Sequence, residues 1–144
     1  WWTLRQYLVN GGDLERRQCE LVILRVATRM HSWYEWASHV VRGLDSGLSL
    51  EEIENVRRDD ARWLEHDAVL LDAVDDIVRE NSITRATLER LAQHFTDRQI
   101  LDVVHLQGMY ATLACVISTW GLELDKHVEQ CLPETVTPEA FANG

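Results

Sequence analysis

Apolar residues recur at helical spacing over most of this 144-residue chain. The clearest stretch is 13–30, where leucines define one face of a helix and β-branched residues widen it almost all the way round. A helix that is apolar on nearly every side must be covered by other elements, so we expect this one at the centre of the fold. Its main apolar positions are Leu14, Leu21, Val22, Ile23, Leu24 and Val26.

Further segments are predicted to be helical from the same periodicity and from residues typical of helix ends. Ser49 with Glu52, and Thr96 with Gln99, have the spacing of a capping box, which closes the first turn of a helix. Gly47 suits a helix C-terminus, because glycine adopts the left-handed conformation without strain. The predicted segments are 32–45, a short helix from 49, 60–80, 84–94, 96–120 and a last short turn from 137.

No segment shows the sustained alternation of apolar and polar residues that is typical of a half-buried strand. Both prolines lie near the C-terminus, so most of the chain is free to be helical. We therefore predict an all-α fold of about six or seven helices. A chain of this length can bury a core without a second domain, and we expect residues 1–144 to form a single domain. The apolar runs are interrupted, so we expect no membrane span.

Charge and cysteine content narrow the classes of partner and compartment. Fourteen basic against twenty-four acidic side chains give a net charge of −10, with no basic stripe that could neutralise phosphates, so we expect no binding to nucleic acid. The cysteines Cys19, Cys115 and Cys131 are odd in number and widely spaced. They are typical of reduced thiols in a cytoplasmic protein, and no signal-peptide pattern precedes them.

The stretch HSWYEWASH, residues 31–39, concentrates groups capable of acid–base chemistry. Ser32 and Glu35 have the spacing of a capping box, so a purely structural role at a helix start is one interpretation. A helix start also favours negative charge, so Ser32 could equally contribute to binding an anionic substrate. Glu35 and His39 are four residues apart and would share one face of the helix, close enough for a hydrogen bond.

The run RRQCELVILRVATRMHSWYEWASHV, followed by GLSLEEIENVR, resembles the carboxymuconolactone decarboxylase and alkylhydroperoxidase D superfamily. The family pattern has a glutamate late in one apolar helix and then C-x-x-C-x-x-x-H at the start of the next. Glu20 matches the glutamate and His39 the histidine, whereas Ser32 and Glu35 occupy the two cysteine positions. Neither can act as a peroxidatic or resolving thiol, so the resemblance points to the cysteine-free, decarboxylase-like branch and not to a peroxidase.

The resemblance implies an alkylhydroperoxidase D-like helical domain that assembles as a homo-oligomer, a trimer or hexamer, and needs no cofactor. It also implies that Glu20 approaches His39, which would then lie between two carboxylates and have a raised pKa. His39 would be the proton donor, oriented by Glu20, with Glu35 as a second acid–base group and Tyr34 holding a developing oxyanion. The alternative is that these residues only pack and hydrogen-bond in the core.

Two arginines on the predicted central helix, Arg25 and Arg29, need a partner for their charge. A substrate carboxylate or an acidic side chain of the protein itself would serve, so they are candidate substrate-binding residues together with Ser32. We expect no bound metal: His31 and His39 lie about 12 Å apart along a helix axis, too far to share one ion. Asp102 and His105 form only half of a carboxylate-bridged site.

The leading hypothesis is a cofactor-independent acid–base enzyme that acts on a small cyclic or unsaturated carboxylic acid. By resemblance, it is most simply a carboxymuconolactone decarboxylase-like lyase. The same residues could catalyse an isomerisation, cyclisation or ring opening, because the walls of the pocket determine the substrate. The competing hypothesis is a non-catalytic oligomeric module in which the acid–histidine cluster holds subunits together.

Overall fold

The computed structural model describes residues 1–10 and 12–142, and this part of the chain contains nine helices and no strand. The predicted all-α fold is therefore confirmed. The helices are α1 (Trp2–Asn10), α2 (Arg16–Arg29), α3 (Trp33–Asp45), α4 (Leu50–Asn55), α5 (Glu65–Glu80), α6 (Arg85–Leu91), α7 (Asp97–Trp120), α8 (Lys126–Cys131) and α9 (Pro138–Ala142).

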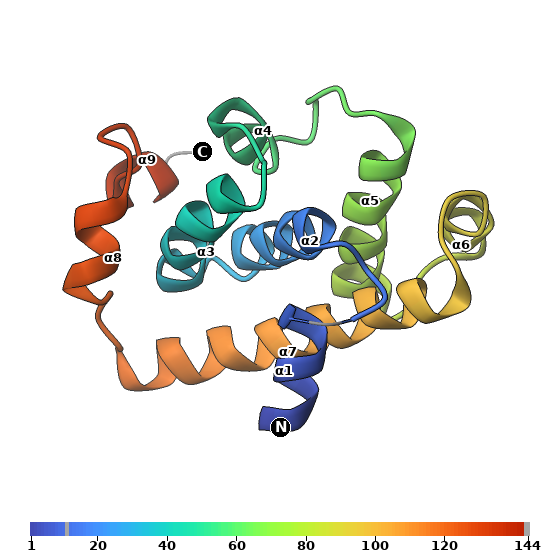
Figure 1. The fold of residues 1–144 in the computed structure, drawn as a ribbon, viewed down its shortest axis with the longest axis horizontal. Coiled ribbons are helices and arrows are strands. Elements are labelled where there is room, and N and C mark those ends of the chain that lie inside the picture. Colours follow the sequence, from blue (N-terminus) through green and yellow to red (C-terminus); the bar gives the residue numbers. More distant parts are fainter. Residues whose placement is uncertain (11, 143–144) are drawn as a thin grey trace.

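Helix α2 lies at the centre of the molecule, as its pattern predicts. Every residue from Cys19 to Ala27 is buried, including two that are charged, Glu20 and Arg25. Figure 1 shows α2 between α3 and α5, with α7 passing along their edge. A helix that meets protein on every side leaves its polar side chains no water, so each of them needs a partner from a neighbouring helix.

The predicted helix starts at Ser49 and Thr96 are also confirmed. Each hydroxyl accepts a hydrogen bond from the backbone N–H three residues on, and the Glu52 or Gln99 side chain accepts one from the backbone N–H of its own cap. Gly47 follows the end of α3 with a φ of +96°, a conformation that suits glycine.

Other boundaries differ from the prediction. Helix α5 begins at Glu65 and not near residue 60, and its first turn contains Glu65 and Asp67, whose charges suit the positive end of a helix. The short helices α1 and α8 are not predicted from the sequence. Their positions depend on tertiary contacts, since α1 packs on α2 and α7 through Leu8, and α8 packs on α3.

Helix α7 runs along the length of the molecule (Figure 1) and has 24 residues. One side packs against α2 and α5, whereas the other leaves apolar residues in solvent, among them Leu101, Val104 and Trp120. Of the helices in residues 1–10 and 12–142, only α7 is long and apolar enough to cross a membrane. The core helix of a globular domain meets the same criterion, so the expected absence of a membrane span stays a prediction.

A cluster of charges joins α2 to α5. Asp75 on α5 accepts hydrogen bonds from Arg25, at 2.9 Å to Nε, and from Arg29, at 2.7 Å to Nε. Asp59, in the connection between α4 and α5, binds the same two guanidinium groups. Burial raises the pKa of Asp75, but the hydrogen bonds from Arg29 and Arg25 outweigh this effect and the pKa is lowered.

Replacing Asp75 by asparagine should destabilise the fold, because two arginines would lose their shared carboxylate. We expect the free energy of unfolding to fall by about 2 kcal/mol at pH 7, less than for a fully buried pair because Asp75 keeps some solvent contact. A lowered pKa stabilises the fold above the ordinary pKa of aspartate, and this contribution is lost as the pH falls through the folded-state value. Urea unfolding should therefore show the gap between wild type and D75N narrowing from pH 7 to pH 3.

Glu89→Gln is the matched control for this experiment. It breaks the exposed ion pair with Arg85 on α6 and should change the free energy of unfolding by less than about 0.5 kcal/mol. Equal losses in the two variants, or a gap for D75N that does not depend on pH, would contradict a stabilising role for the buried cluster.

Candidate active site

The buried pair Glu20 and His39 is the first component of the candidate site. Nδ1 of His39 on α3 lies 2.6 Å from Oε2 of Glu20 on α2, and both side chains are almost completely buried. The turn between the two helices brings them together across nineteen residues of sequence: Ser32 begins α3, and His31 before it has a φ of +52°. The structure thus places Glu20 beside His39, as the family resemblance implies.

The direction of the pKa shift of His39 is opposite to the prediction. Burial lowers the pKa of His39, and the hydrogen bond and charge of Glu20 oppose that effect without overcoming it. The prediction was wrong because it counted two carboxylates and no loss of water. A neutral His39 that donates from Nδ1 to Glu20 has its lone pair on Nε2. Nη1 of Arg42 lies 3.4 Å from that atom, at the long end of hydrogen-bond distance, and can donate to it.

His39 lines a pocket of about 320 Å³, within the range of small-molecule sites. Helix α3 contributes most of the polar wall, with Tyr34, Glu35, Ser38, His39 and Arg42. Helix α7 contributes Tyr110 and an apolar wall, α1 contributes Arg5, and the segment from Leu122 to Val128 closes another side; the α7 wall consists of Leu113, Val116 and Ile117. The pocket therefore combines one polar helix face with an apolar one.

A larger hollow of about 450 Å³ lies beside α2 and α5, but it differs from the pocket at His39 in how its charged groups are paired. Its buried charges are already paired, since Arg17 binds both Glu52 and Asp67. Charges that neutralise one another offer little to a ligand. The pocket at His39 is the better candidate, because two of its polar side chains, Glu35 and Tyr110, have buried oxygens without a hydrogen-bond partner among the described residues.

Glu35 is the clearest of these unsatisfied groups. Its side chain is buried, and neither carboxylate oxygen has a hydrogen-bond partner within residues 1–10 and 12–142. Burial raises the pKa of Glu35 to about 7, against a small opposing effect of the nearby Ser32 hydroxyl. The expected hydrogen bond from Glu35 to His39 is not formed.

The capping-box interpretation of Ser32 is also wrong. Ser32 is the N-cap of α3, but its side chain forms no cap hydrogen bond, and its buried hydroxyl has no partner in the part of the chain that the structure describes. Ser32 does not line the pocket either, so a direct role in substrate binding has no support from the geometry.

Two tyrosines line the pocket, and only Tyr34 was singled out from the sequence. The Tyr34 hydroxyl donates a hydrogen bond to Asp125, at 3.2 Å, so this phenol is already engaged. Tyr110 is buried, and its hydroxyl has no hydrogen-bond partner among the residues that the structure describes. Its ring meets that of His39 edge-on, with the centroids 4.9 Å apart. Burial raises the pKa of Tyr110 to about 12, so it stays a hydrogen-bond donor at neutral pH. The sequence signal was a lone phenol within a long apolar helix, where a hydroxyl needs a partner.

The arginines of the pocket are not the predicted ones. Arg25 and Arg29 bind Asp75 and Asp59 and do not line the pocket, so their assignment to substrate binding is corrected to an internal ion cluster. The protein's own acidic side chains satisfy them, as the alternative interpretation allowed.

Metal-ligating residues are not grouped in the part of the chain that the structure describes: no three of His, Cys, Asp and Glu there could hold an ion together. His31 precedes α3 and is not on its face. Asp102 accepts hydrogen bonds from the backbone N–H groups of Asp13 and Leu14, which gives it a structural role at the start of α2.

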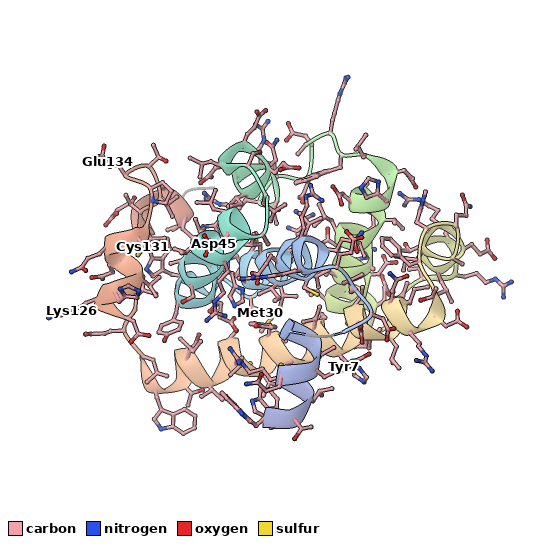
Figure 2. The ribbon with its side chains drawn as sticks, viewed as in Figure 1. Tyr7, Met30, Asp45, Lys126, Cys131 and Glu134 are labelled. Atoms are coloured by element: carbon pink, nitrogen blue, oxygen red, sulfur yellow. The ribbon has the colours of Figure 1, made fainter. Side chains whose placement is uncertain are left out.

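The cysteines lie outside the pocket. Cys19 is buried on α2, and burial raises the pKa of its thiol to about 12. Cys115 and Cys131 are exposed, Cys131 on the outer helix α8 (Figure 2). A thiolate is needed to attack peroxide, and this pocket supplies none from its own residues.

The helices described above form an AhpD-like fold, and solved structures support this. An uncharacterized peroxidase-related protein from Silicibacter sp. TM1040 aligns with a TM-score of 0.80 at 19% identity, over 88% of this chain and 69% of that chain. A protein of unknown function from Agrobacterium tumefaciens, described as a candidate antioxidant defence protein AhpD, aligns with a TM-score of 0.78 at 23% identity, over 86% and 87%. At these identities the similarity concerns the fold alone, and the predicted AhpD-like fold is confirmed.

A sequence model of the carboxymuconolactone decarboxylase family matches residues 1–75, more than half of the chain. No curated protein matches the sequence. The matched segment contains Glu20, Glu35 and His39. The chain therefore belongs to the carboxymuconolactone decarboxylase family.

The raised pKa of Glu35 should be visible as a dependence of stability on pH. A carboxyl group whose pKa is higher in the folded state binds its proton more tightly there, so stability falls as the pH rises from 4.5 towards 7. Glu35→Gln removes this penalty. We expect E35Q to gain stability relative to wild type by up to about 3 kcal/mol between pH 4.5 and pH 8, as measured by urea unfolding.

The exposed substitution Glu134→Gln is the control and should show no such gain. Carbon-13 NMR of the Glu35 carboxyl group gives the pKa directly and should place its midpoint near 7. A midpoint near 4.5 in the folded protein would show that Glu35 is solvated and would remove it as a neutral acid.

Proposed function

We propose that this protein is a cofactor-independent acid–base enzyme that acts on a small cyclic or unsaturated carboxylic acid, most simply as a decarboxylase-like lyase. One observation carries the proposal. A histidine oriented by a buried glutamate and a second, unpartnered carboxyl group with a pKa of about 7 line the same pocket. Two neighbouring groups with pKa values moved in opposite directions are typical of an acid and a base.

The roles follow from the protonation states. Glu35 is substantially protonated near neutral pH and is the proton donor. His39 is neutral and is the proton acceptor, held in one tautomer by Glu20. This exchanges the roles expected from the sequence, because burial raises the pKa of Glu35 to about 7 and lowers the pKa of His39.

In a decarboxylation, the bond between the carboxylate carbon and its neighbouring carbon breaks and carbon dioxide leaves. The electron pair moves through a conjugated double bond onto a carbonyl oxygen, which gives an enolate. Glu35 then protonates the enolate at carbon. His39 accepts a proton from solvent at Nε2 and returns it to Glu35, so each turnover consumes one proton and releases one carbon dioxide.

A proton-shift isomerisation is the second candidate, favoured by the neutral state of His39. His39 would remove a proton next to a carbonyl group, and Glu35 would protonate the other end of the resulting dienolate. No carbon–carbon bond breaks in this reaction. Release of carbon dioxide therefore separates the two candidates directly.

Peroxide reduction is not proposed for this chain, although one solved structure of the same fold is described as peroxidase-related. The positions that hold thiols in the family pattern are Ser32 and Glu35 here. A hydroxyl group and a carboxyl group cannot supply the thiolate and the resolving thiol.

We also propose that the chain forms a homo-oligomer through the exposed apolar side of α7. Leu101 is 52% exposed and Val104, one turn further along α7, is 39% exposed. The exposed Leu88 of α6 lines the same apolar hollow. Apolar side chains gathered along one helix are typical of a subunit interface. This surface also supports the competing hypothesis of a non-catalytic oligomeric module.

The central prediction concerns His39. The absorbance of γ-carboxymuconolactone should decay with wild-type protein, and His39→Ala should lower kcat about a hundredfold or more, because proton transfer is lost. Glu20→Gln should also lower kcat, since an amide orients the ring less well and cannot stabilise an imidazolium. His94→Ala, at an exposed histidine on the segment after α6, is the matched control and should keep full activity.

The outcomes distinguish the hypotheses. Turnover that survives in H39A would remove His39 from the mechanism. No turnover by any variant would exclude the name-giving reaction of the family for this chain. Loss of the oligomer in H39A, with no activity in wild type towards unsaturated acids, would favour the structural module.

The oligomer has its own test. Leu101→Glu should shift the mass found by size-exclusion chromatography with light scattering towards the monomer value of 16.7 kDa, because a charge is costly in an apolar interface. Glu134→Lys, away from α7, should leave the assembly unchanged. A wild-type protein that is already monomeric would overturn the proposed interface.

A further inference from the structure

We propose that Arg5 and Arg42 hold a carboxylate of the substrate and that Tyr110 donates a hydrogen bond to its carbonyl oxygen. This deepens the proposed function, on which it rests, by assigning the residues that determine specificity. The three side chains come from α1, α3 and α7, and all of them line the pocket at His39.

The two arginines stand out because neither forms an ion pair with a carboxylate of the described residues. Among the described residues, the other arginines with restricted solvent access form an ion pair with aspartate or glutamate, as Arg25 and Arg90 do. Arg16, Arg62 and Arg98 have no such pair but are exposed to solvent. Arg5 and Arg42 are half-buried and form no ion pair with a carboxylate of the described residues, in a chain with ten more acidic than basic groups.

The two guanidinium groups act on the same place. Arg42 lies 3.4 Å from Nε2 of His39, and the charges of Arg42 and Arg5 both lower the pKa of His39 and of Tyr110. Arg5 also stacks on Trp2, with its guanidinium carbon 5.2 Å from the ring centroid. Two guanidinium groups that line one pocket suit a carboxylate, which accepts paired hydrogen bonds from the fork of a guanidinium group.

Tyr110 supplies an independent observation. Its side chain is 98% buried, yet its hydroxyl has no hydrogen-bond partner among the described residues. A buried hydroxyl without a partner is costly, so a bound oxygen would satisfy it. Its position against the His39 ring places this donor where an enolate oxygen would form during proton transfer.

The apolar wall of α7 completes the description of the ligand. Leu113, Val116 and Ile117 face a polar wall that carries the arginines. The expected ligand is a small acid with a carboxylate at one end, a carbonyl group within a few carbons of it, and an apolar body between them. Amides and esters of the same acid should bind poorly, because they lack the charge.

Three probes separate the two contacts without requiring turnover. They are 4-oxopentanoate, which has both groups, pentanoate, which has only the carboxylate, and 4-oxopentanamide, which has only the carbonyl group and a neutral end. Binding is measured by ligand-observed NMR titration at pH 6.5, after size-exclusion chromatography and circular dichroism confirm that each variant is folded. Wild type should bind 4-oxopentanoate about tenfold more tightly than either of the other probes.

The variants Arg5→Gln and Arg42→Gln should each weaken binding of 4-oxopentanoate and pentanoate about tenfold and leave 4-oxopentanamide unchanged. Tyr110→Phe should remove the preference for 4-oxopentanoate over pentanoate while keeping the preference for the charged probe. Arg98→Gln and Tyr7→Phe, at exposed positions, are the matched controls and should bind all three probes as wild type does.

Equal affinity of wild type for the acid and its amide, or no binding of the acid at up to about 20 mM, would overturn the proposal. If both arginine variants bind 4-oxopentanoate as tightly as wild type does, the proposed role of Arg5 and Arg42 is wrong. Failure of the acid–base function has a different signature, since the acid would still bind selectively while no unsaturated acid is turned over.

Discussion

The hydrogen bond between Glu20 and His39 links the fold of this protein to its chemistry. Glu20 belongs to a helix with no side open to solvent, and a carboxyl group in such a place needs a partner from another element. His39 provides that partner from α3, which ties the position of α3 to the burial of α2. Because that bond occupies Nδ1, Nε2 of the ring is left facing the pocket, where Arg42 approaches it.

Exclusion of water then sets the protonation states around this bond. It penalises the charged form of every group, so the pKa of His39 falls while that of Glu35 rises to about 7. One turn of helix thus carries both a neutral base and a neutral acid. In the family pattern two cysteines occupy this location. Here Ser32 and Glu35 take their places, and of the two only Glu35 lines the pocket and suits proton transfer.

The fold class and the Glu20–His39 pair could be predicted from the sequence, whereas the walls of the pocket could not. Periodicity and capping boxes predicted the long helices, and a spacing shared with a known family predicted the pair. Arg5 and Tyr110 were not identified as site residues from the sequence. The hydrophobic pattern of α1 is weak and α7 is apolar on most sides, so the local sequence does not indicate which of their residues face His39. Arg25 and Arg29 were candidate ligands only because their partners, Asp75 and Asp59, are remote in sequence.

The sequence by itself therefore determined an all-helical chain, a central apolar helix and the residue types available for acid–base chemistry. These properties depend on the spacing of apolar and polar residues within short segments, which can be read directly from the sequence. Only the tertiary structure decided which charges neutralise one another, which hydroxyl and carboxyl groups stay unpartnered, and in which direction each pKa moves. Those properties depend on burial and on contacts between distant helices, and neither is a property of any single segment.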